Sequence, residues 1–565
     1  MVDGSDLSRR QVLAALGVSG STALGGCNWN ADSGASDDTP ADTDEPDSRT
    51  ATRIETETRE RTPTEQRSTD DEAPDITRFE LVTTDTAGIV RYDLSASDES
   101  GIAVATLTTA TGTPVRLTDP ATPLDATGTA EVESGGMRSV TARVEDDAGN
   151  EAETTERAYA RRFDVLDERS HDIGAVYRPT AGGEWVDCID GAPAVGEYGT
   201  PPSAAVVAEQ VDYAQWAGLN RWVVPVDDPG RLAGLDTLAA RPMAGSIAFE
   251  VALDPHPALT GAQSFERLLA AVRERIESVP TYATCDGRPV VSVARLGEYD
   301  DDRGGFYPHS NVTSAFDSGA AFVETLRESL AVDGTDPYLV GGLGMRSLHN
   351  YETNLTDAYR AFAGAFDALV QDTYDPGEGT VPWDRAFELN AERLFAGRRL
   401  ADEVALDFEP VVFPGWDTVV DTCSESAESI PRSPSHLEAF LRAADLFGTT
   451  GRVRVESFND WERGTQIEPG RIRGDDYGRS YLRAVRSFQS SGTDRDVYGR
   501  TEYHVAPDGS DTNAGSEARP LATIQHALSR AEPGDTVRVG PGRYTESVET
   551  RRAGTAESPI TVTGP

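Results

Sequence analysis

Residues Phe458-Asn459-Asp460-Trp461-Glu462-Arg463-Gly464-Thr465-Gln466-Ile467-Glu468-Pro469 follow directly on the alternating run Arg452-Val453-Arg454-Val455-Glu456-Ser457. The alternating run is typical of a β-strand, and a helical pattern begins near Tyr477. The stretch between them combines aromatic side chains, three carboxylates, an amide and a glycine. A rigid strand that ends in a polar loop holds that loop where it can meet a ligand. This stretch is therefore the first candidate for a functional site.

Strands alternate with amphipathic helical patterns over residues 163–490. This alternation predicts a (β/α)8 barrel, because each parallel strand needs a crossover helix before the next strand begins. The predicted strands are Ile173–Tyr177, Arg221–Val226, Ser246–Val251, Pro289–Val293, Tyr338–Gly341, Phe366–Val370, Leu406–Phe413 and Val453–Phe458, and the clearest helices are Ala204–Trp216, Phe265–Ile276, Phe322–Leu330 and Arg385–Asp402. The opening stretch then lies at the carboxyl end of strand eight, on the rim where active sites of this fold form.

Two segments precede the predicted barrel. Residues 28–75 are rich in Asp, Glu, Thr, Ser and Pro, with almost no large apolar residues, which predicts a disordered acidic tether. Residues 76–161 show short alternating runs between turn clusters, which predict an antiparallel β-sandwich. Its turn Asp146-Asp147-Ala148-Gly149-Asn150 resembles a hairpin of immunoglobulin-like spacer modules. A carbohydrate-binding module is the alternative, which we disfavour because no aromatic cluster offers a platform for a sugar.

The amino terminus predicts export. Ser8-Arg9-Arg10-Gln11-Val12-Leu13 is a twin-arginine pattern, and an apolar stretch too short to span a bilayer follows it. Leu24-Gly25-Gly26-Cys27 resembles a lipoprotein cleavage site, so that residues 1–27 hold the signal and Cys27 becomes the lipid-bearing terminus. A cleaved signal with an incidental cysteine is the alternative. We expect a protein anchored by lipid to the outer face of the cell membrane.

The composition of the chain limits which classes of partner and cofactor are expected. The net charge of -45 excludes nucleic acid as the expected partner, because phosphate binding needs clustered cations. All 51 basic residues are arginine, and an acidic, lysine-free chain is similar in composition to the proteins of extremely halophilic archaea. Outside Cys27 the cysteines are Cys188, Cys285 and Cys423, which predict neither a disulfide framework nor a zinc site. No metal and no cofactor are expected.

The opening stretch resembles the asparagine–carboxylate–tryptophan motif of glycoside hydrolase family 99, the endo-α-mannosidase family. There the motif reads Asn-Glu-Trp-x-Glu-Gly-Thr-Gln-Ile-Glu. Further segments are similar to the same superfamily in the same order, namely Gly174–Pro179, Val206–Gln210, Ala217–Asn220, Asp286–Val291 and Asp407–Asp417. The resemblance implies a (β/α)8 barrel that cleaves a glycan with retention, through participation of the 2-hydroxyl of the substrate.

Carried over by position, the resemblance assigns roles to individual residues. Asp460 stands at the position of the base, with one methylene fewer than the family's Glu. Arg463 stands at the acid/base position, where a guanidinium cannot cycle a proton near pH 7. Glu462 is the candidate for the missing acid, and Arg463 can instead bind a carboxylate or sulfate of a substrate or hold a neighbouring Glu. The further substrate-binding candidates are Asn459, Trp461, Glu468, Tyr177, Glu250 and Trp416.

Two functions therefore stay open. The first is an exported glycoside hydrolase acting on an extracellular or cell-surface polysaccharide, with Asp460 and Glu462 as its catalytic residues. The second is a non-catalytic glycan receptor or surface scaffold, favoured by the arginine at position 463. A solvated ion-pair cluster without a ligand is a third interpretation of Asp460, Glu462 and Arg463.

Residues 498–565 change character again. Tyr503–Asp511, Pro520–Leu528 and Pro533–Tyr544 resemble the opening cap and first rung of right-handed parallel β-helix proteins of the pectate-lyase type. One rung cannot bury its stacked face alone. We therefore expect a module that is only marginally stable by itself.

Overall fold

The structure is a computed structural model. It describes residues 71–564 except 119, 167–168, 180–190, 197, 200, 241–242, 244–245, 260–261, 301, 344–354, 372–378, 418–427, 473–474, 491–501, 510–519, 532–535 and 549–558. The predicted signal, Cys27 and the tether up to residue 70 lie outside the described residues. No described helix combines the length and apolar character that a membrane crossing requires.

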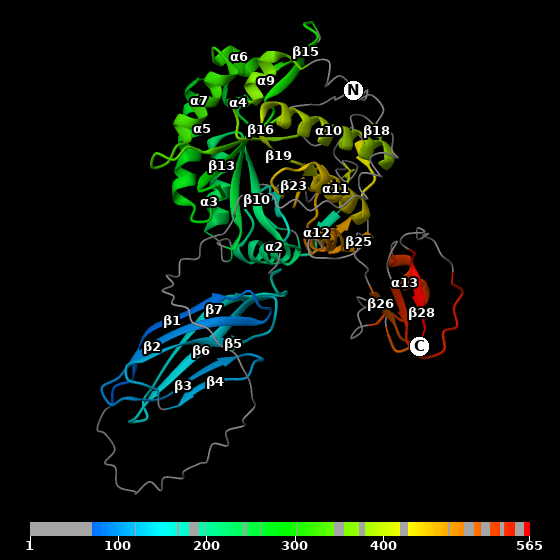
Figure 1. Ribbon diagram of the computed structural model, residues 1–565. Coiled ribbons are helices and arrows are strands. Elements are labelled where there is room, and N and C mark those ends of the chain that lie inside the picture. Colours follow the sequence, from blue (N-terminus) through cyan, green and yellow to red (C-terminus); the bar gives the residue numbers. More distant parts are fainter. Residues whose placement is uncertain are drawn as a thin grey trace, which may run out of the picture.

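Two antiparallel sheets form the N-terminal part of the described chain (Figure 1). Their cores follow from strict alternation, as in Val140, Ala142 and Val144, which are fully buried while their neighbours face outward. One sheet holds β1 (Asp75–Thr83), β2 (Ile89–Ser97) and β5 (Leu124–Glu131), and the other holds β4 (Val115–Thr118), β3 (Ile102–Thr109), β6 (Gly136–Asp146) and β7 (Glu151–Ala160). The predicted all-β segment is confirmed at this level, and its likeness to spacer modules stays a prediction.

A nearly closed parallel barrel follows. Its strands are β8 (Asp172–Val176), β10 (Leu219–Val226), β11 (Ala248–Leu253), β13 (Arg288–Val293), β16 (Tyr338–Gly342), β17 (Ala368–Val370), β19 (Asp407–Glu409) with β20 (Val411–Val412), and β23 (Arg452–Val455). Each strand pairs in parallel with the next, and β23 pairs with β8. At the seventh position, β19 pairs with β17 and β20 pairs with β23. Pro410 lies between β19 and β20, so the chain itself joins the two ends of the sheet there. The predicted barrel is confirmed in this form.

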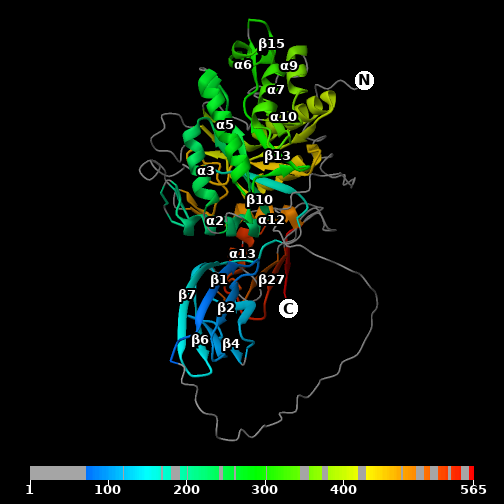
Figure 2. The same ribbon diagram turned by 90° about the vertical axis from the view of Figure 1, so that its left-hand side faces the viewer.

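Helices cover the outside of the barrel, as expected for parallel strands buried on both faces (Figures 1 and 2). One helix follows each strand position in turn: α2 (Ala204–Ala217), α3 (Leu232–Ala239), α5 (Ala262–Ser278), α7 (Gly319–Leu330), α9 (Asp357–Ala363), α10 (Trp383–Val404), α11 (Pro434–Phe447) and α12 (Ser480–Ser490). The last helix is tied to the first strand, because Gln489 accepts from the His171 N–H and donates to the carbonyl oxygens of His171 and Gly218. The four predicted helices are confirmed within a few residues.

Short elements complete the barrel loops. They are β9 (Gly191–Pro193), η2 (Pro229–Arg231), α4 (His256–Leu259), β12 (Thr284–Cys285), β14 (Gly297–Asp300), β15 (Gly305–Pro308), α6 (Ser310–Ala315), β18 (Gly379–Thr380), β21 (Trp416–Asp417), β22 (Glu428–Ile430), β24 (Gly470–Ile472) and β25 (Asp475–Gly478). The predicted seventh strand, Leu406–Phe413, is in fact interrupted at Pro410, which has no N–H to donate to a neighbouring strand.

One disulfide departs from the sequence expectation. Cys285 is fully buried at the start of the fourth strand hairpin and is disulfide-bonded. The other cysteines of the chain all lie outside the described residues. Three scattered cysteines still allow one disulfide with one cysteine left over, because spacing along the chain does not fix spatial pairing.

The two-sheet domain is joined to the barrel through Asp212 on α2. This buried carboxylate accepts the Arg162 N–H at 2.7 Å and the Tyr159 hydroxyl at 3.4 Å, and it lies 3.8 Å from the Arg161 guanidinium. Tyr159 and Arg161 are themselves almost completely buried. The connection is therefore a packed interface between the two domains.

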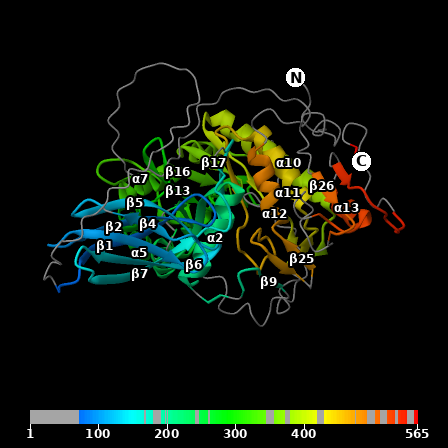
Figure 3. The ribbon, with the colours of Figure 1, turned by 90° about the horizontal axis from the view of Figure 1, so that it is seen from below.

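The C-terminal part is a small parallel sheet of β26 (Glu502–Val505), β27 (Thr536–Val539) and β28 (Thr561–Thr563), with α13 (Ile524–Arg530) between the first two strands. It lies away from the two-sheet domain, on the α12 side of the barrel (Figure 3). The Glu546 carboxylate accepts the N–H groups of Ile524 and Gln525 at the start of α13, where a negative charge is favourable. The assignment of this part to a right-handed β-helix stays a prediction.

Candidate functional site

A cavity of about 510 Å³ opens at the carboxyl ends of the barrel strands. Residues at or just beyond the end of every strand position line it, so it occupies the mouth of the barrel. Its polar and aromatic lining consists of Arg178, Asp227, Arg231, Asp254, Ser292, Arg295, Gln371, Trp416, Arg454, Glu456 and Arg463. The opening stretch of the sequence contributes Arg463, and the strand before it contributes Arg454 and Glu456.

Strand alternation decides which side chains of the eighth strand face the interior. Val453 and Val455 pack into the apolar core shared with the helices. Arg452 and Arg454 face the opposite way, into a buried ion cluster inside the barrel. Glu456 continues the same face one step further, and its side chain reaches the cavity. Arg452, Arg454 and Glu456 therefore form one charged face of the strand, which runs from the barrel interior to the mouth.

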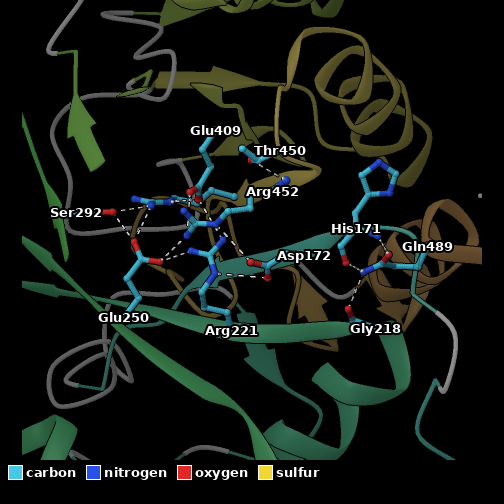
Figure 4. Close-up of polar contacts among 11 residues, drawn as sticks. His171, Asp172, Gly218, Arg221, Glu250, Ser292, Glu409, Thr450, Arg452 and Gln489 are labelled. Atoms are coloured by element: carbon cyan, nitrogen blue, oxygen red, sulfur yellow. Dashed lines mark hydrogen bonds and ion pairs between the residues drawn. The ribbon is translucent and has the colours of Figure 1, made fainter. Parts of the chain in front are cut away.

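The barrel ion cluster fills the interior below the cavity (Figure 4). Its members are three arginines and three carboxylates, namely Asp172, Arg221, Glu250, Glu409, Arg452 and Arg454. Arg454 lies 2.9 Å from Glu250 and 3.1 Å from Glu409, and it donates to the Ser292 hydroxyl at 2.7 Å. Gly174 leaves room for the Arg221 guanidinium, because a Cβ there would lie 2.7 Å from its Cζ.

Glu250, a substrate-binding candidate from the sequence, belongs to this buried cluster. It has no exposed surface and contacts Arg221, Arg452, Arg454 and Ser292. Burial by itself would raise the pKa of Glu250, but the neighbouring arginines outweigh burial and hold that pKa below its usual range. A carboxylate kept ionised by several guanidinium groups stabilises the barrel interior and is poorly placed to contact a sugar.

Asp460 and Asn459 are buried beside the cavity and contact Arg178, in the loop after the first strand. Asn459 has no exposed surface, accepts the Arg178 N–H at 2.8 Å and donates to the Arg178 carbonyl at 3.1 Å. The Asp460 side chain is 3% exposed, lies 2.6 Å from the Arg178 Nε and accepts the Arg463 N–H at 3.2 Å. Neither side chain lines the cavity. Their catalytic and binding roles stay predictions.

Trp461, Glu468 and Tyr177 belong to one buried hydrogen-bond chain. Glu468 accepts from the Trp461 indole at 3.0 Å, the Tyr198 hydroxyl at 2.9 Å and the Gln210 amide at 2.7 Å. The Tyr177 hydroxyl donates to the other end of the Gln210 amide at 2.6 Å. Burial raises the pKa of Glu468 to about 7. These hydrogen bonds fix the loop that carries Arg463, and the substrate-binding roles of Trp461, Glu468 and Tyr177 stay predictions.

Glu456, Arg463 and Trp416 meet at the cavity itself. The Arg463 guanidinium lies 5.7 Å from the centre of the Trp416 ring and 3.8 Å from Glu456. The Glu456 side chain is 14% exposed, and burial raises its pKa although Arg178 and Arg463 act in the opposite direction. Trp416 lines the cavity, and its indole N–H has no hydrogen-bond partner among the described residues.

Glu456 and Asp460 form a pair of acidic groups. One nitrogen of Arg463 lies 3.8 Å from a Glu456 oxygen and 3.7 Å from an Asp460 oxygen. These two oxygens are therefore no farther apart than the sum of those distances, which lies below the upper end of the range of about 5 to 9.5 Å seen for paired carboxyl groups in glycosidases. Of the two, only Glu456 lines the cavity. Glu462 is exposed and is not part of the lining.

Among the described residues, no group of three or more His, Cys, Asp or Glu side chains is arranged to hold a metal ion. The polar and aromatic groups that line the mouth of the barrel are guanidinium, carboxyl, hydroxyl, amide and indole groups. Groups of these kinds can bind polar ligands by hydrogen bonds.

Comparison with known proteins gives matches to separate parts of the chain. Residues 507–551 match the family described as protein of unknown function DUF1565. The uncharacterized protein YwoF of Bacillus subtilis is 35% identical over 78 residues, which are 14% of this chain and 17% of YwoF. The match thus spans under a fifth of that relative.

Solved structures of glycoside hydrolase type resemble the barrel. A glycoside hydrolase-like protein gives a TM-score of 0.44 at 18% identity, over 58% of this chain and 95% of the other. The GH99 endo-alpha-mannosidase of Bacteroides thetaiotaomicron gives 0.42 at 14% identity, over 58% of this chain and 98% of the other. Likeness at this level carries no information about activity, and the functional argument rests on the cavity.

The sequence interpretation found Trp416 and Arg463 but missed Glu456 and Arg178. Glu456 follows Arg452 and Arg454 at a spacing of two, so the alternation that predicts the strand also places it on the inward face. Arg178 follows the first strand directly, and no pattern in the sequence links it to a loop that begins 281 residues later. Asp227 and Asp254 also line the cavity, and their position directly after a barrel strand was the only sequence feature that could have pointed to them.

Proposed function

We propose that this protein binds a glycan in the mouth of its barrel, at the outer surface of the cell. One observation carries the proposal: Trp416 and Arg463 lie side by side on a cavity lined by carboxylates, arginines, an amide and a hydroxyl. Sugars present polar edges and weakly polar faces, and an aromatic side chain flanked by such groups suits both.

The size of the cavity supports this function. Its volume of about 510 Å³ lies in the range of roughly 300 to 1,000 Å³ that is usual for small-ligand pockets. The walls are held by backbone pairing and by the barrel ion cluster, so the site is formed before a ligand arrives. A preformed site loses little conformational entropy on binding.

Recognition is better supported than hydrolysis by Asp460 and Glu462. Asp460 is 3% exposed and in ion contact with Arg178, and Glu462 lies outside the lining. A catalytic acid or base must come within hydrogen-bond reach of the substrate. We therefore place the glycan-binding function first.

Glycoside hydrolysis through Glu456 is the second candidate, favoured by its raised pKa in a cavity. The protonated carboxyl would donate its proton to the leaving glycosidic oxygen. Asp227 or Asp254, which line the same cavity, would act on the opposite face of the sugar. Arg463 does not take part in proton transfer on this account.

The experiment for both functions uses the full chain in concentrated salt. Isothermal titration with neutral and acidic oligosaccharides is expected to show binding that weakens at least tenfold in Trp416→Ala, since the aromatic surface is lost. Absence of binding to every oligosaccharide would reject the proposal. Release of reducing ends that Glu456→Gln abolishes and Glu462→Gln does not would establish hydrolysis.

Export and lipid anchoring through Cys27 are part of the proposal. The twin-arginine and Leu-Gly-Gly-Cys patterns support them, and so does the disulfide at Cys285, since such bonds persist mainly in oxidising compartments. Cys27→Ser is expected to move the protein from the membrane fraction to the medium. Retention of this variant in the membrane would contradict lipid anchoring.

A further inference from the structure

We propose that the cavity binds a sugar that carries an anionic group, a carboxylate or a sulfate, and that Arg463 and Trp416 hold that group. This inference rests on the proposed glycan function and specifies its ligand. It starts from two neighbouring hydrogen-bond donor groups, the Arg463 guanidinium and the Trp416 indole, for which the described residues provide no hydrogen-bond acceptor.

Arg463 supplies the first set of donors. Its side chain is 48% exposed, and its guanidinium makes no hydrogen bond within the described part of the chain. The nearest carboxylate oxygens, on Asp460 and Glu456, lie at 3.7 and 3.8 Å, beyond hydrogen-bond distance. The forked N–H groups of a guanidinium match the paired oxygens of a carboxylate or sulfate.

Trp416 supplies the second donor. Its side chain is 9% exposed and lines the cavity, and its indole N–H lacks a partner among the described residues. An indole nitrogen can only donate, so a ligand group that reaches this buried N–H would supply the acceptor that it lacks. A neutral hydroxyl offers one weak acceptor, whereas an anionic group offers several strong acceptors to Arg463 and Trp416 together.

The charge balance of the lining points the same way. The whole chain has 51 basic and 96 acidic residues, so carboxylates outnumber arginines nearly two to one. Among the described lining residues the order is reversed, with arginines at 178, 231, 295, 454 and 463 against acids at 227, 254 and 456. Asp460, the other carboxylate near Arg463, already has Arg178 at 2.6 Å. Arg463 is therefore not needed to neutralise it.

Glu456 adds a proton-linked consequence. An anion bound at Arg463 becomes an additional negative neighbour of the Glu456 carboxyl, which raises the pKa of that group further. Binding then takes up a proton and strengthens as the pH falls. A neutral sugar adds no such charge, so we expect binding of the anionic ligand to depend more strongly on pH than binding of the neutral one.

The test compares three oligosaccharides of equal length by titration of the full chain at one high salt concentration. They are an oligouronate, a sulfated oligosaccharide and a neutral oligomannoside. We expect at least one anionic ligand to bind about tenfold or more tightly than the neutral one, in line with charge-assisted hydrogen bonds. Binding of the uronate alone assigns a carboxylate, and binding of the sulfated ligand alone assigns a sulfate.

Three variants locate the effect. Arg463→Gln and Trp416→Phe, which keeps the ring and removes the N–H, are each expected to lower the affinity for the anionic ligand several-fold more than the affinity for the neutral one. Arg303→Gln is the matched control, because Arg303 is 58% exposed, stacks on the Tyr307 ring at 3.9 Å and lies outside the cavity. Glu456→Gln is expected to remove the pH dependence.

Two outcomes overturn the inference in distinguishable ways. Equal binding of neutral and anionic ligands, unchanged in Arg463→Gln, rejects the anionic subsite and leaves the proposed glycan function in place. Absence of binding to all three ligands rejects the glycan function and this inference with it.

Discussion

Glu468 is a carboxyl group with no exposed surface that accepts hydrogen bonds from Gln210, Trp461 and Tyr198. Its pKa is raised from 4.5 to about 7 by burial, despite these donors. A group whose pKa is raised on folding contributes full stability below its unfolded pKa, and that stability is lost as the pH rises through its folded pKa. The window for Glu468 therefore runs from about pH 4.5 to pH 7.

Replacement of this carboxyl provides the first prediction. The free energy of unfolding of the wild-type chain should fall between pH 5 and pH 8 by up to about 3 kcal/mol from Glu468. Glu468→Gln should remove that part of the pH dependence, because the amide does not titrate. Denaturant unfolding at fixed salt measures the difference. Glu462→Gln, an exposed change in the same loop, is the control, and equal pH slopes in both variants would contradict the account.

Residue roles were the least predictable part of the site. Asn459, Trp461 and Glu468 follow the family pattern, and the structure uses them to hold the loop by buried hydrogen bonds. A sequence pattern does not separate a side chain that faces a ligand from one that faces its own scaffold, since both are polar and follow a strand. Only the path of the loop, which buries Asp460 and exposes Arg463, decides between them.

At the scale of elements, the barrel ion cluster replaces the apolar layers that commonly fill such barrels. Its three arginines and three carboxylates balance in charge, and they come from β8, β10, β11, β19 and β23. A balanced cluster is stable only while every member is present, because removal of one charge leaves its partners buried and uncompensated.

The second prediction concerns this cluster. Glu250→Gln should lower the free energy of unfolding by about 3 to 5 kcal/mol, because Arg221, Arg452 and Arg454 lose one shared counter-charge. Glu277→Gln removes a surface pair with Arg273, in which both side chains are nearly half exposed, and should change it by less than about 0.5 kcal/mol. Denaturant unfolding of both variants provides the comparison, and a Glu250→Gln effect as small as that of Glu277→Gln would refute the role of the cluster.

Most elements were predictable from periodicity, and the exceptions have physical causes. The alternation of strands and helices located every barrel strand, since buried parallel strands read as short apolar runs between amphipathic helices. Pro410 broke the seventh strand where the apolar run continued without interruption. No sequence pattern shows that Arg452 and Arg454 face into the barrel, because their six-membered cluster is assembled from segments far apart in sequence.

For the whole molecule, the joint at Asp212 connects the two-sheet domain to the barrel. The third prediction is that Asp212→Ala loosens this joint, since the Arg162 N–H and the Tyr159 hydroxyl lose their acceptor and Arg161 loses its buried counter-charge. Limited proteolysis should then cut faster between the two domains. Asp85→Ala is the matched control, because Asp85 pairs with the same Arg161 but its side chain is 77% exposed. Equal cleavage of the two variants would speak against a packed joint.

The order of parts along the chain was readable from composition, whereas their contacts were not. Among the described parts, the alternating strands and the strand–helix repeats differ in periodicity, and this difference separates the two-sheet domain from the barrel. Asp212, however, sits in a helical pattern whose sequence does not show which part of the molecule this face meets. A charge on the buried face of a helix was the available signal, because such a charge needs a partner.

A crystal structure of the chain grown with its tightest-binding oligosaccharide tests the central claim most directly. The account predicts the sugar in the mouth of the barrel, against Trp416, with an acidic group on Arg463 and a hydroxyl near Glu456. A sugar bound instead on the two-sheet domain or the C-terminal sheet, with the barrel cavity filled only by water, would contradict it.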